Sequence, residues 1–423
     1  MTESALNTLL LTSSKPGHRN VEEVFLAEML DCIPRDTVFW AALTPAIDPE
    51  VEQNDRLAGF KQLLAQKEHF PHDPRAWTRF NVLLHQFTRY RYAVRKLTHV
   101  TSQLVAVQSP HQLWTVLSSL SVIDVAWGLS KTLQIPTLVQ VWDDPLHLLR
   151  ERRMDHLTRT RTMRHFFELL ERADRVAVIG ESMQATYAKY TKEQPIIIRH
   201  GLNAVVKSEF KPGASTEFRI GFCGAMYARS AWKCLERALE SLEWKLSGRN
   251  VVLEVASPEI AFTAERPAMV RYHGWQTKCS SARESVDRAV GLMSNCDLLY
   301  LPQAFEPVSR PLTELSFPTK LSTYVSTGCP ILVHTPDYGS LNDFCRTHDF
   351  GVVCNELNVK SMADLLVGIA NNPIKMQELA RGTIRIATDV LSRQNFRNSV
   401  REFLSPDLVE ADEAVLDLAS NAL

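Results

Sequence analysis

The sequence lacks a surplus of charge of either sign: it has 47 lysines and arginines against 48 aspartates and glutamates, a formal net charge of −1. Proteins whose main partner is nucleic acid usually carry a strong basic surplus, so this balance argues against nucleic acid as a partner. Hydrophobic residues make up 45% of the chain and charged residues 22%, as in an ordinary globular protein. A length of 423 residues predicts two or three domains, because a single hydrophobic core rarely grows that large.

Long hydrophobic runs and paired cysteines are also missing. No stretch approaches the ~20 apolar residues that a membrane-spanning helix needs, and the short apolar run at 9–11 does not make a secretory signal. None of the eight cysteines forms a C-x-x-C pair, and the thirteen histidines show no metal-ligand spacing. The sequence therefore predicts a cytoplasmic protein with reduced, scattered thiols and no bound metal.

Short apolar runs alternate with longer helical patterns in the first half, which predicts a parallel sheet wound with helices. The expected strands lie at 8–12, 37–43, 113–117, 137–142, 176–179 and 196–198. Residues 50–100 are polar, with no clear strand and with aromatics among helix formers, and they predict a helical insertion. A single long basic helix is expected at 146–172.

The same rhythm restarts after a linker-like stretch at 203–217. The expected strands lie at 219–223, 251–255, 270–273, 297–301, 331–334 and 351–354, and terminal helices at 359–371, 374–390 and 396–404. We expect one domain at 1–202, a second at 203–390, and a terminal helix with an acidic tail at 391–423. Two doubly wound halves predict a cleft between them, and ligands of such sheets lie beyond the carboxyl ends of the strands.

One segment carries a resemblance. Residues 316–333, SFPTKLSTYVSTGCPILV, resemble a signature of the group 1 (family 4) glycosyltransferases: a Pro-x-Lys-Leu helix, a small residue, Gly-x-Pro and a buried strand. The strand and glycine turn at 219–224, the strand at 297–302 and the strand and turn at 196–203 resemble the family in the same order. The resemblance covers about residues 174–404 and is weaker in the first half, where 8–17 and 136–144 fit.

The resemblance implies a GT-B fold, α/β, with two Rossmann-like doubly wound parallel-sheet domains that face a cleft. The first half would bind the acceptor, with a helical insertion at about 50–100, and the second half a nucleotide-sugar donor. The implied activity is a metal-independent hexosyltransferase without a cofactor. It would move a sugar from a nucleotide diphosphate to an acceptor hydroxyl, with retention, in glycan or polysaccharide biosynthesis. The acceptor would be a glycan, a lipid-linked molecule or a protein, and the terminal helix would return to the first domain.

The donor diphosphate would lie near the helix expected to begin at Pro318. A proline in the first turn costs no hydrogen bond, and free N–H groups with the positive end of the helix dipole favour phosphate, beside Lys320. The family's basic pair after the donor glycine is altered here: Gly224 is followed by Ala-Met, which leaves Arg229 and Lys233 as diphosphate-binding candidates. The alternative for these basic residues is a solvated helix surface.

The family's two glutamates, eight positions apart, are missing at their expected places. Their positions hold Leu315 and Thr323, and Thr323 would bond the ribose more weakly than a carboxylate. A glutamate pair with the right separation, Glu306 and Glu314, lies nine residues too early. We take Glu314 as a candidate to reach the sugar hydroxyls; the alternative is a coincidental spacing in a chain rich in acids.

Two carboxylates, Asp143 and Asp144, end a buried strand at the predicted cleft, where the family often has a His-Asp pair and this chain has Trp142 in place of the histidine. Such a carboxylate could orient the acceptor hydroxyl or stabilise an oxocarbenium-like transition state. The alternative is an aspartate that caps the following helix.

Three further residues are candidates by position. Gly17 would let the backbone approach the donor phosphates closely. His18 and His200 are acceptor-binding candidates; the alternative for both is a residue that only shapes its turn.

The basic helix that contains Arg150 and Arg164 has two interpretations: a solvated face, or a surface for anionic lipid or an acidic acceptor at the inner face of the membrane. Two alternative functions also stay open. One is a nucleotide-sugar epimerase on the same scaffold, and the other is a non-catalytic GT-B interaction protein, which the missing glutamates favour.

Overall fold

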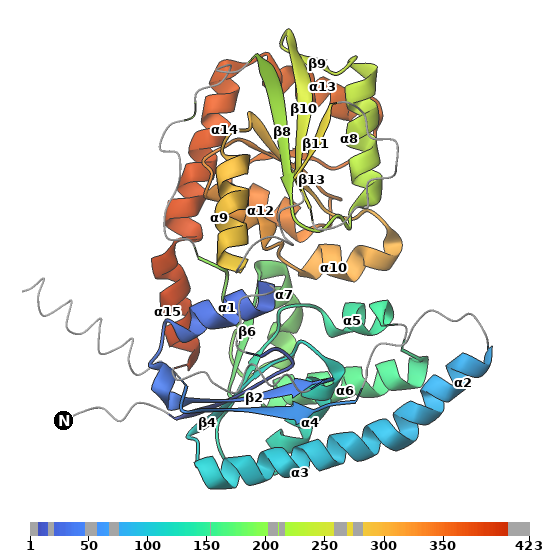
Figure 1. Ribbon diagram of the computed structural model, residues 1–423, viewed down its shortest axis with the longest axis vertical. Helices are drawn as coiled ribbons and strands as arrows, with labels where there is room; N and C mark the ends of the chain where they lie inside the picture. Colours follow the sequence, from blue (N-terminus) through green and yellow to red (C-terminus); the bar gives the residue numbers. More distant parts are fainter. Residues whose placement is uncertain are drawn as a thin grey trace, which may run out of the picture. The chain divides into compact units, whose positions relative to one another are not determined.

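The computed structural model describes residues 7–15, 21–46, 57–66, 76–152, 154–201, 210, 216–257, 269–273 and 282–404. Contacts divide the chain into two compact units: Met1–Ile198 with Arg397–Leu423, and Arg199–Phe396. Each unit is built around one sheet of parallel strands with helices on its faces (Figure 1). The predicted fold class, two doubly wound α/β domains, is confirmed.

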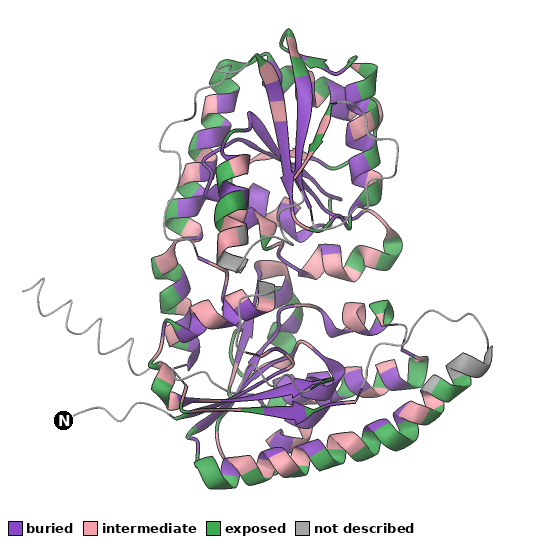
Figure 2. Ribbon diagram, in the orientation of Figure 1, coloured by how far each residue is buried: buried purple, intermediate pink, exposed green. Residues whose placement is uncertain are grey.

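The first sheet has the strand order β3-β2-β1-β4-β5-β6-β7, all parallel. Its strands are β1 (Thr8–Thr12), β2 (Val38–Thr44), β3 (Gly59–Leu64), β4 (Gln112–Val116), β5 (Thr137–Gln140), β6 (Arg175–Val178) and β7 (Ile196–Ile197). Every residue of β1, β4 and β5 is buried, which is expected for parallel strands covered on both faces. Figure 2 shows this core in purple.

Helices cover both faces of the first sheet. They are α1 (Val21–Leu30), α2 (Ala76–His85), the π-helical turn η3 (Gln86–Tyr90), α3 (Arg91–Gln108), α4 (Leu120–Ser130), α5 (Pro145–Glu151), α6 (His156–Arg172), α7 (Glu181–Tyr187) and α15 (Arg393–Leu404). Helix α4 packs on β1 and β4, between α3 and α6. The α15 end belongs to this unit: Gln112 Nε2 donates to the Leu404 carbonyl (3.0 Å) and Arg175 Nη1 to the Glu402 carbonyl (3.2 Å).

The second sheet has the order β11-β10-β8-β12-β13-β14, with β9 antiparallel to β10. Its strands are β8 (Glu217–Cys223), β9 (Lys245–Leu246), β10 (Arg249–Ala256), β11 (Val270–Tyr272), β12 (Leu298–Pro302), β13 (Ile331–His334) and β14 (Val352–Cys354). Its helices are α8 (Arg229–Ser241), α9 (Ala282–Met293), α10 (Arg310–Leu315), α11 (Lys320–Val325), α12 (Ser340–His348), α13 (Val359–Ala370), α14 (Pro373–Arg385) and the π-helical turn η7 (Ile386–Val390).

The expectation that residues 50–100 hold no strand was wrong. Strand β3 pairs with β2 from Gly59 opposite Phe39 to Leu64 opposite Thr44. It is an edge strand, half-exposed, with lysine and glutamine in its middle, so its sequence lacks a continuous apolar signal. The helices α2, η3 and α3 follow β3.

The single long helix expected at 146–172 was also wrong, because two helices, α5 and α6, occupy it. Asp155 caps α6 by accepting a hydrogen bond from the Thr158 N–H (2.9 Å) and another from the Thr158 hydroxyl (2.6 Å). Just before it, Met154 is buried with Tyr90 and Leu149. The hydrogen bonds of the new N-cap and the burial of Met154 stabilise the break more than a continuous helix would be stabilised by its own backbone bonds.

A buried carboxylate joins the helices on one face of the first sheet. Asp124 of α4, 3% exposed, accepts hydrogen bonds from the Tyr90 hydroxyl (3.0 Å) and from Arg161 Nη2 (3.4 Å) and lies 2.7 Å from His165 Nδ1. The His165 ring stacks on Trp127 with ring centroids 3.7 Å apart. Asp124 therefore fastens both η3 and α6 to α4.

We expect Asp124→Ala to lower the free energy of unfolding of the first unit by about 3–5 kcal/mol, because it leaves a half-buried arginine and a buried histidine without their carboxylate. Urea unfolding followed by tryptophan fluorescence measures the loss. The matched control is Asp31→Ala, which breaks a partly exposed pair with Arg35 and should cost less than about 1 kcal/mol. Equal losses for the two variants would contradict the role given to Asp124.

Candidate functional site

Both sheets reverse their strand order at one point, between β1 and β4 in the first and between β8 and β12 in the second. Ligands of doubly wound sheets lie beyond the carboxyl ends of the strands at such a point. In the second sheet this point is the turn that begins at Gly224, directly after β8. The candidate donor site therefore lies around this turn.

Gly224 has a backbone φ of +93°, which disfavours any residue with a side chain. A Cβ at this position would also lie 2.7 Å from Cε of Lys320. Two residues that sequence analysis placed at the donor site, Gly224 and Lys320, thus lie in direct contact. The conformation favours glycine, and any side chain at this position would displace the end of the lysine that lies against it.

The Lys320 ammonium is held against the Gly224 turn. It donates to the Ala225 carbonyl oxygen and lies 4.7 Å from the ring centroid of Phe222 and 4.5 Å from that of Tyr227. Burial lowers the pKa of Lys320 from its usual 10.5 to about 8. A half-buried cation beside the carboxyl end of a central strand is suited to bind an anionic ligand.

The helix expected to begin at Pro318 begins instead at Lys320 and is short, spanning Lys320–Val325. Two N–H groups of its first turn are already used, because the Leu321 N–H donates to the Pro318 carbonyl (3.0 Å) and the Ser322 N–H to the Thr319 carbonyl (3.2 Å). These two N–H groups are therefore not free to bind phosphate. The charge of Lys320 is the other attraction for an anion at this helix end.

The two candidate glutamates, Glu306 and Glu314, lie in different surroundings. The Glu306 carboxylate lies at the start of α8, where Oε1 accepts from the Ser230 N–H at 3.4 Å. Its Oε2 and the Ser230 hydroxyl are both buried and make no hydrogen bond with a described residue. Two buried polar groups without partners could take the hydroxyls of a ligand. Sequence analysis missed Ser230, because no motif marks it.

Glu314 points elsewhere. It pairs with Arg310 on the same helix at 3.2 Å and is half-exposed. The loop between the glutamates is fixed by Gln303, whose Nε2 donates to the Thr313 carbonyl (3.4 Å), while the Thr313 hydroxyl donates to the Ala304 carbonyl (2.8 Å). The spacing of eight residues therefore does not bring Glu306 and Glu314 to one place.

The remaining donor candidates lie on two helices. Arg229 and Lys233 are exposed, one turn apart, at the start of α8. Thr323 is half-buried on α11, one turn after Lys320.

The structure gives Asp144 of the first unit a structural role. It is 5% exposed; Oδ1 accepts from the His147 N–H (3.0 Å) and caps α5, and Oδ2 accepts from the Tyr187 hydroxyl (2.8 Å). Both carboxylate oxygens are engaged, as in the capping alternative for this residue. Trp142, two residues earlier, is buried and packs against Phe25 with ring centroids 5.2 Å apart.

Asp143 lies in a polar group at the carboxyl edge of the first sheet. Burial raises the pKa of Glu22, a residue of α1, and the nearby Asp143 carboxylate raises it further. Glu22 accepts a hydrogen bond from the Ser14 hydroxyl, and the hydroxyls of Ser13 and Ser118 lie 2.6 Å apart where the strand order reverses. Glu22 was missed by sequence analysis, because no motif marks it.

Gly17 and His18 lie outside the described residues. His200 belongs to the second unit, where its carbonyl accepts from the Ser322 hydroxyl (3.2 Å) and its ring lies 6.2 Å from that of Phe396. His200 thus braces α11, the helix of Lys320.

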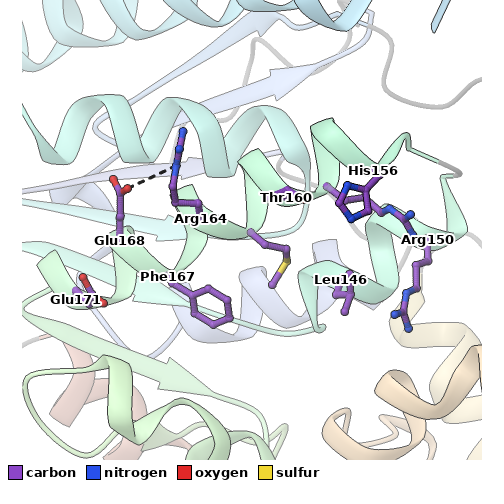
Figure 3. Close-up of a pocket in the computed structure, with 10 residues that line it drawn as sticks. Leu146, Arg150, His156, Thr160, Arg164, Phe167, Glu168 and Glu171 are labelled. Carbon is purple, nitrogen blue, oxygen red and sulfur yellow. Dashed lines mark ion pairs between the residues drawn. The ribbon is translucent and has the colours of Figure 1, made fainter. Parts of the chain in front are cut away.

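A groove of about 640 Å³ runs along α5 and α6 in the first unit (Figure 3). Arg150 and His156 line one end and Glu171 the other, and Arg164 pairs with Glu168 at 3.7 Å. The groove joins a basic end to an acidic end, so it could bind an anionic group only near Arg150.

Within the described residues, no group of three or more histidines, cysteines, aspartates or glutamates could hold a metal ion. The seven described cysteines are all buried free thiols. No helix of the described chain is long and apolar enough to span a bilayer.

No family model matches the chain, and neither does any curated protein. Several solved structures, however, are similar to this chain. Sucrose-phosphate synthase from Thermosynechococcus elongatus is similar at 13% identity and a TM-score of 0.61, over 96% of this chain and all of that one. HepE from Anabaena, solved with UDP, follows at 14% identity and a TM-score of 0.59, over 95% of this chain and 100% of its own.

The α,α-trehalose 6-phosphate synthase from Burkholderia multivorans is similar at 10% identity and a TM-score of 0.62, over 97% of this chain and 100% of its own. Likenesses at such low identity concern the fold. Together with the two strand orders they show that the chain has the GT-B fold.

Replacing Lys320 by Met removes the charge and keeps a long side chain. The lowered pKa means that the protonated lysine reduces the stability of the folded state. This loss of stability is fully present below about pH 8 and disappears as the pH rises toward 10.5. We expect Lys320→Met to raise the melting temperature at neutral pH, by about 2–4 °C for each kcal/mol relieved, and this gain to shrink above pH 8.

Scanning calorimetry at several pH values tests this expectation. Lys233→Met is the matched control, since Lys233 is exposed and its loss should leave the melting temperature nearly unchanged. A Lys320→Met variant that melts below the wild type at neutral pH would contradict the penalty.

Proposed function

We propose that the protein is a glycosyltransferase that takes a sugar from a nucleoside-diphosphate donor and transfers it to an acceptor hydroxyl. The observation that carries the proposal is the Lys320 ammonium, which is half-buried against the Gly224 turn at the strand-order reversal of a GT-B domain. A partly desolvated cation at this position matches the charge of a diphosphate.

The donor would make three sets of contacts in the second unit. Lys320 would pair with the diphosphate, assisted by Arg229 and Lys233 at the exposed start of α8. Thr323 would bond the ribose. The sugar hydroxyls would satisfy Glu306 Oε2 and the Ser230 hydroxyl, which have no hydrogen-bond partner among the described residues.

The acceptor would bind the first unit near Asp143 and Glu22. In the transfer step the acceptor oxygen forms a bond to the anomeric carbon, the bond from that carbon to the diphosphate oxygen breaks, and the acceptor proton passes to a carboxylate or to the departing phosphate. A carboxylate such as Asp143 would orient the hydroxyl or stabilise the positive charge of the sugar in the transition state. By the family resemblance, the reaction retains the anomeric configuration and needs no metal.

The similar structures support a hexosyl donor. HepE was solved with UDP, with UDP-glucose, and with UDP and glucose, and a trehalose-phosphate synthase among the similar structures is described as UDP-forming. UDP-glucose is therefore the first donor to test, with a glycan, a lipid-linked molecule or a protein as the acceptor class.

A second candidate function is nucleotide binding without sugar transfer. Thr323 replaces the family's ribose-binding glutamate, and Glu314 is paired with Arg310. Labelled donor separates the alternatives: transfer needs an acceptor, an epimerase changes the sugar without one, and a binding protein leaves the donor intact.

Donor binding is tested by thermal shift against UDP-, GDP-, ADP- and TDP-sugars. A ligand that binds only the native state at a hundred times its Kd should stabilise it by about 2.7 kcal/mol. Because the Lys320 pKa is about 8, we expect the affinity to fall as the pH rises through 8, when the ammonium loses its proton.

Lys320→Met should abolish both the shift and its pH dependence, while Glu314→Gln should keep both. Failure of every nucleotide sugar to shift the wild type would sink the proposal.

Substituting asparagine for each of the two adjacent aspartates should have different effects. Asp143→Asn should lower kcat by about 10²-fold or more, since its carboxylate is assigned to proton transfer or charge stabilisation. Asp144→Asn should lower the melting temperature, since Asp144 caps α5 and accepts from Tyr187. Initial rates with UDP-glucose and melting curves of both variants decide this; full activity of Asp143→Asn would exclude the assigned role.

A further inference from the structure

The helix formed by α2, η3 and α3 carries positive charge without any negative charge. No aspartate or glutamate occurs between Asp73 and Asp124, while five basic residues lie within 76–108: Arg79, Arg89, Arg91, Arg95 and Lys96. Figure 1 shows α2 and α3 as one long helix along the edge of the first unit. The near-neutral chain therefore concentrates a basic surplus on one helix.

Large apolar side chains are exposed on the same helix. Phe80 is 54% exposed, Leu84 51% and Phe87 44%, at spacings of four and three residues that place them on one side. Tyr92, 72% exposed, follows one turn later. We call Phe80, Leu84 and Phe87 the apolar stripe.

The apolar stripe is not the side that holds the helix to the fold. That side is formed by buried residues at regular spacing: Gln86, Tyr90, Leu97, Thr101 and Val105. Tyr90 packs with Leu120 and Leu149 and donates to Asp124. Leu84 and Phe87 therefore lie outside the side that positions the helix in the first unit.

The basic side chains beside the stripe are not neutralised. Arg89, Arg91, Arg95 and Lys96 are all exposed, and none is ion-paired with a described residue. Helix α6, the basic helix singled out in the sequence, differs: Arg161 pairs with Asp124 at 3.4 Å and Arg164 with Glu168 at 3.7 Å. Arg161 and Arg164 of α6 are thus paired with carboxylates, whereas the four exposed basic residues of η3 and α3 are not paired with a described residue.

We propose that α2, η3 and the first half of α3 form a docking surface for an anionic lipid bilayer. The apolar stripe would enter the boundary between headgroups and acyl chains, and the four exposed basic residues would bind lipid phosphates. An amphipathic helix with aromatic and leucine side chains on one side and lysine or arginine beside them binds membranes in this way. From Phe80 to Lys96 the surface is about 24 Å long, at about 1.5 Å per residue.

The charge argues against a second copy as the occupant. A symmetric dimer through this surface would bring the same basic residues of both copies together, without an acidic residue to pair them. A bilayer rich in anionic lipid has the complementary charge. This inference does not depend on the proposed sugar transfer, because it rests on the first unit alone.

The test is co-sedimentation of the full chain with vesicles of phosphatidylcholine alone, or with about one third phosphatidylglycerol, at low and high salt. We expect binding only to the anionic vesicles, weakened by salt. Each arginine removed near the surface should weaken binding about fivefold, so the triple variant Arg89→Gln, Arg91→Gln, Arg95→Gln should lose on the order of a hundredfold. The stripe variant Phe80→Ser, Leu84→Ser, Phe87→Ser should also lose binding.

The matched control is Val308→Ser, Ile374→Ser, which removes two apolar side chains of the second unit that are 68% and 69% exposed and should bind like the wild type. Melting curves establish that every variant is folded, and Lys320→Met should still bind vesicles while losing the nucleotide sugar. The proposal is overturned if the wild type does not bind anionic vesicles, or if both triple variants bind them as well as the wild type does. A wild-type dimer that the stripe variant converts to a monomer would equally overturn it, in favour of a second copy.

Discussion

The candidate donor site depends on one tyrosine hydroxyl. Strands β8 and β12 pair only at Ile220–Leu298 and Gly221–Leu299, and beyond these pairs the Cys223 N–H and the Tyr300 carbonyl need other partners. The Tyr324 hydroxyl supplies both, accepting from Cys223 N at 2.9 Å and donating to the Tyr300 carbonyl at 3.1 Å. Buried backbone groups without partners are costly, so this residue closes the sheet where its strand order reverses and fixes α11. The position of Lys320 against the Gly224 turn follows from it.

Because α11 is fixed in this way, the protein holds the Lys320 ammonium at a place where folding disfavours a charge. The Lys320 ammonium loses hydration and gains a carbonyl oxygen and two aromatic rings in return. Groups that are costly in the empty protein and satisfied by a ligand are characteristic of binding sites. Glu306 Oε2 and the Ser230 hydroxyl, buried without hydrogen-bond partners among the described residues, belong to the same pattern. In the first unit, the raised pKa of Glu22 beside Asp143 is a related case at the carboxyl edge of the other sheet.

Most of the fold could be predicted because parallel strands buried on both faces appear in the sequence as continuous apolar runs. Strands β1, β12 and β13 are examples. The strand that was missed, β3, pairs on one side only and keeps polar residues in its middle. The helix that was overextended breaks where Asp155 offers a cap and Met154 a buried side chain, and that choice depends on Tyr90, far away in the sequence. For the site, the motif led to Gly224 and Lys320, which are in contact, whereas the glutamate spacing led to Glu314, which pairs with Arg310.

By itself, the sequence determined the two-part α/β organisation, the short strands and the lysine of the signature segment, because periodicity and local motifs act over a few residues. Only the tertiary structure decided which polar side chains gather. Glu306 lies at Ser230, Asp144 is used as a cap and a partner of Tyr187, and Glu22 lies beside Asp143. The same holds for charge, since Arg161 and Arg164 of α6 find acidic partners, while the exposed basic residues of η3 and α3 have none among the described residues. Such contacts join residues distant in the chain, and no local pattern encodes the distance between them.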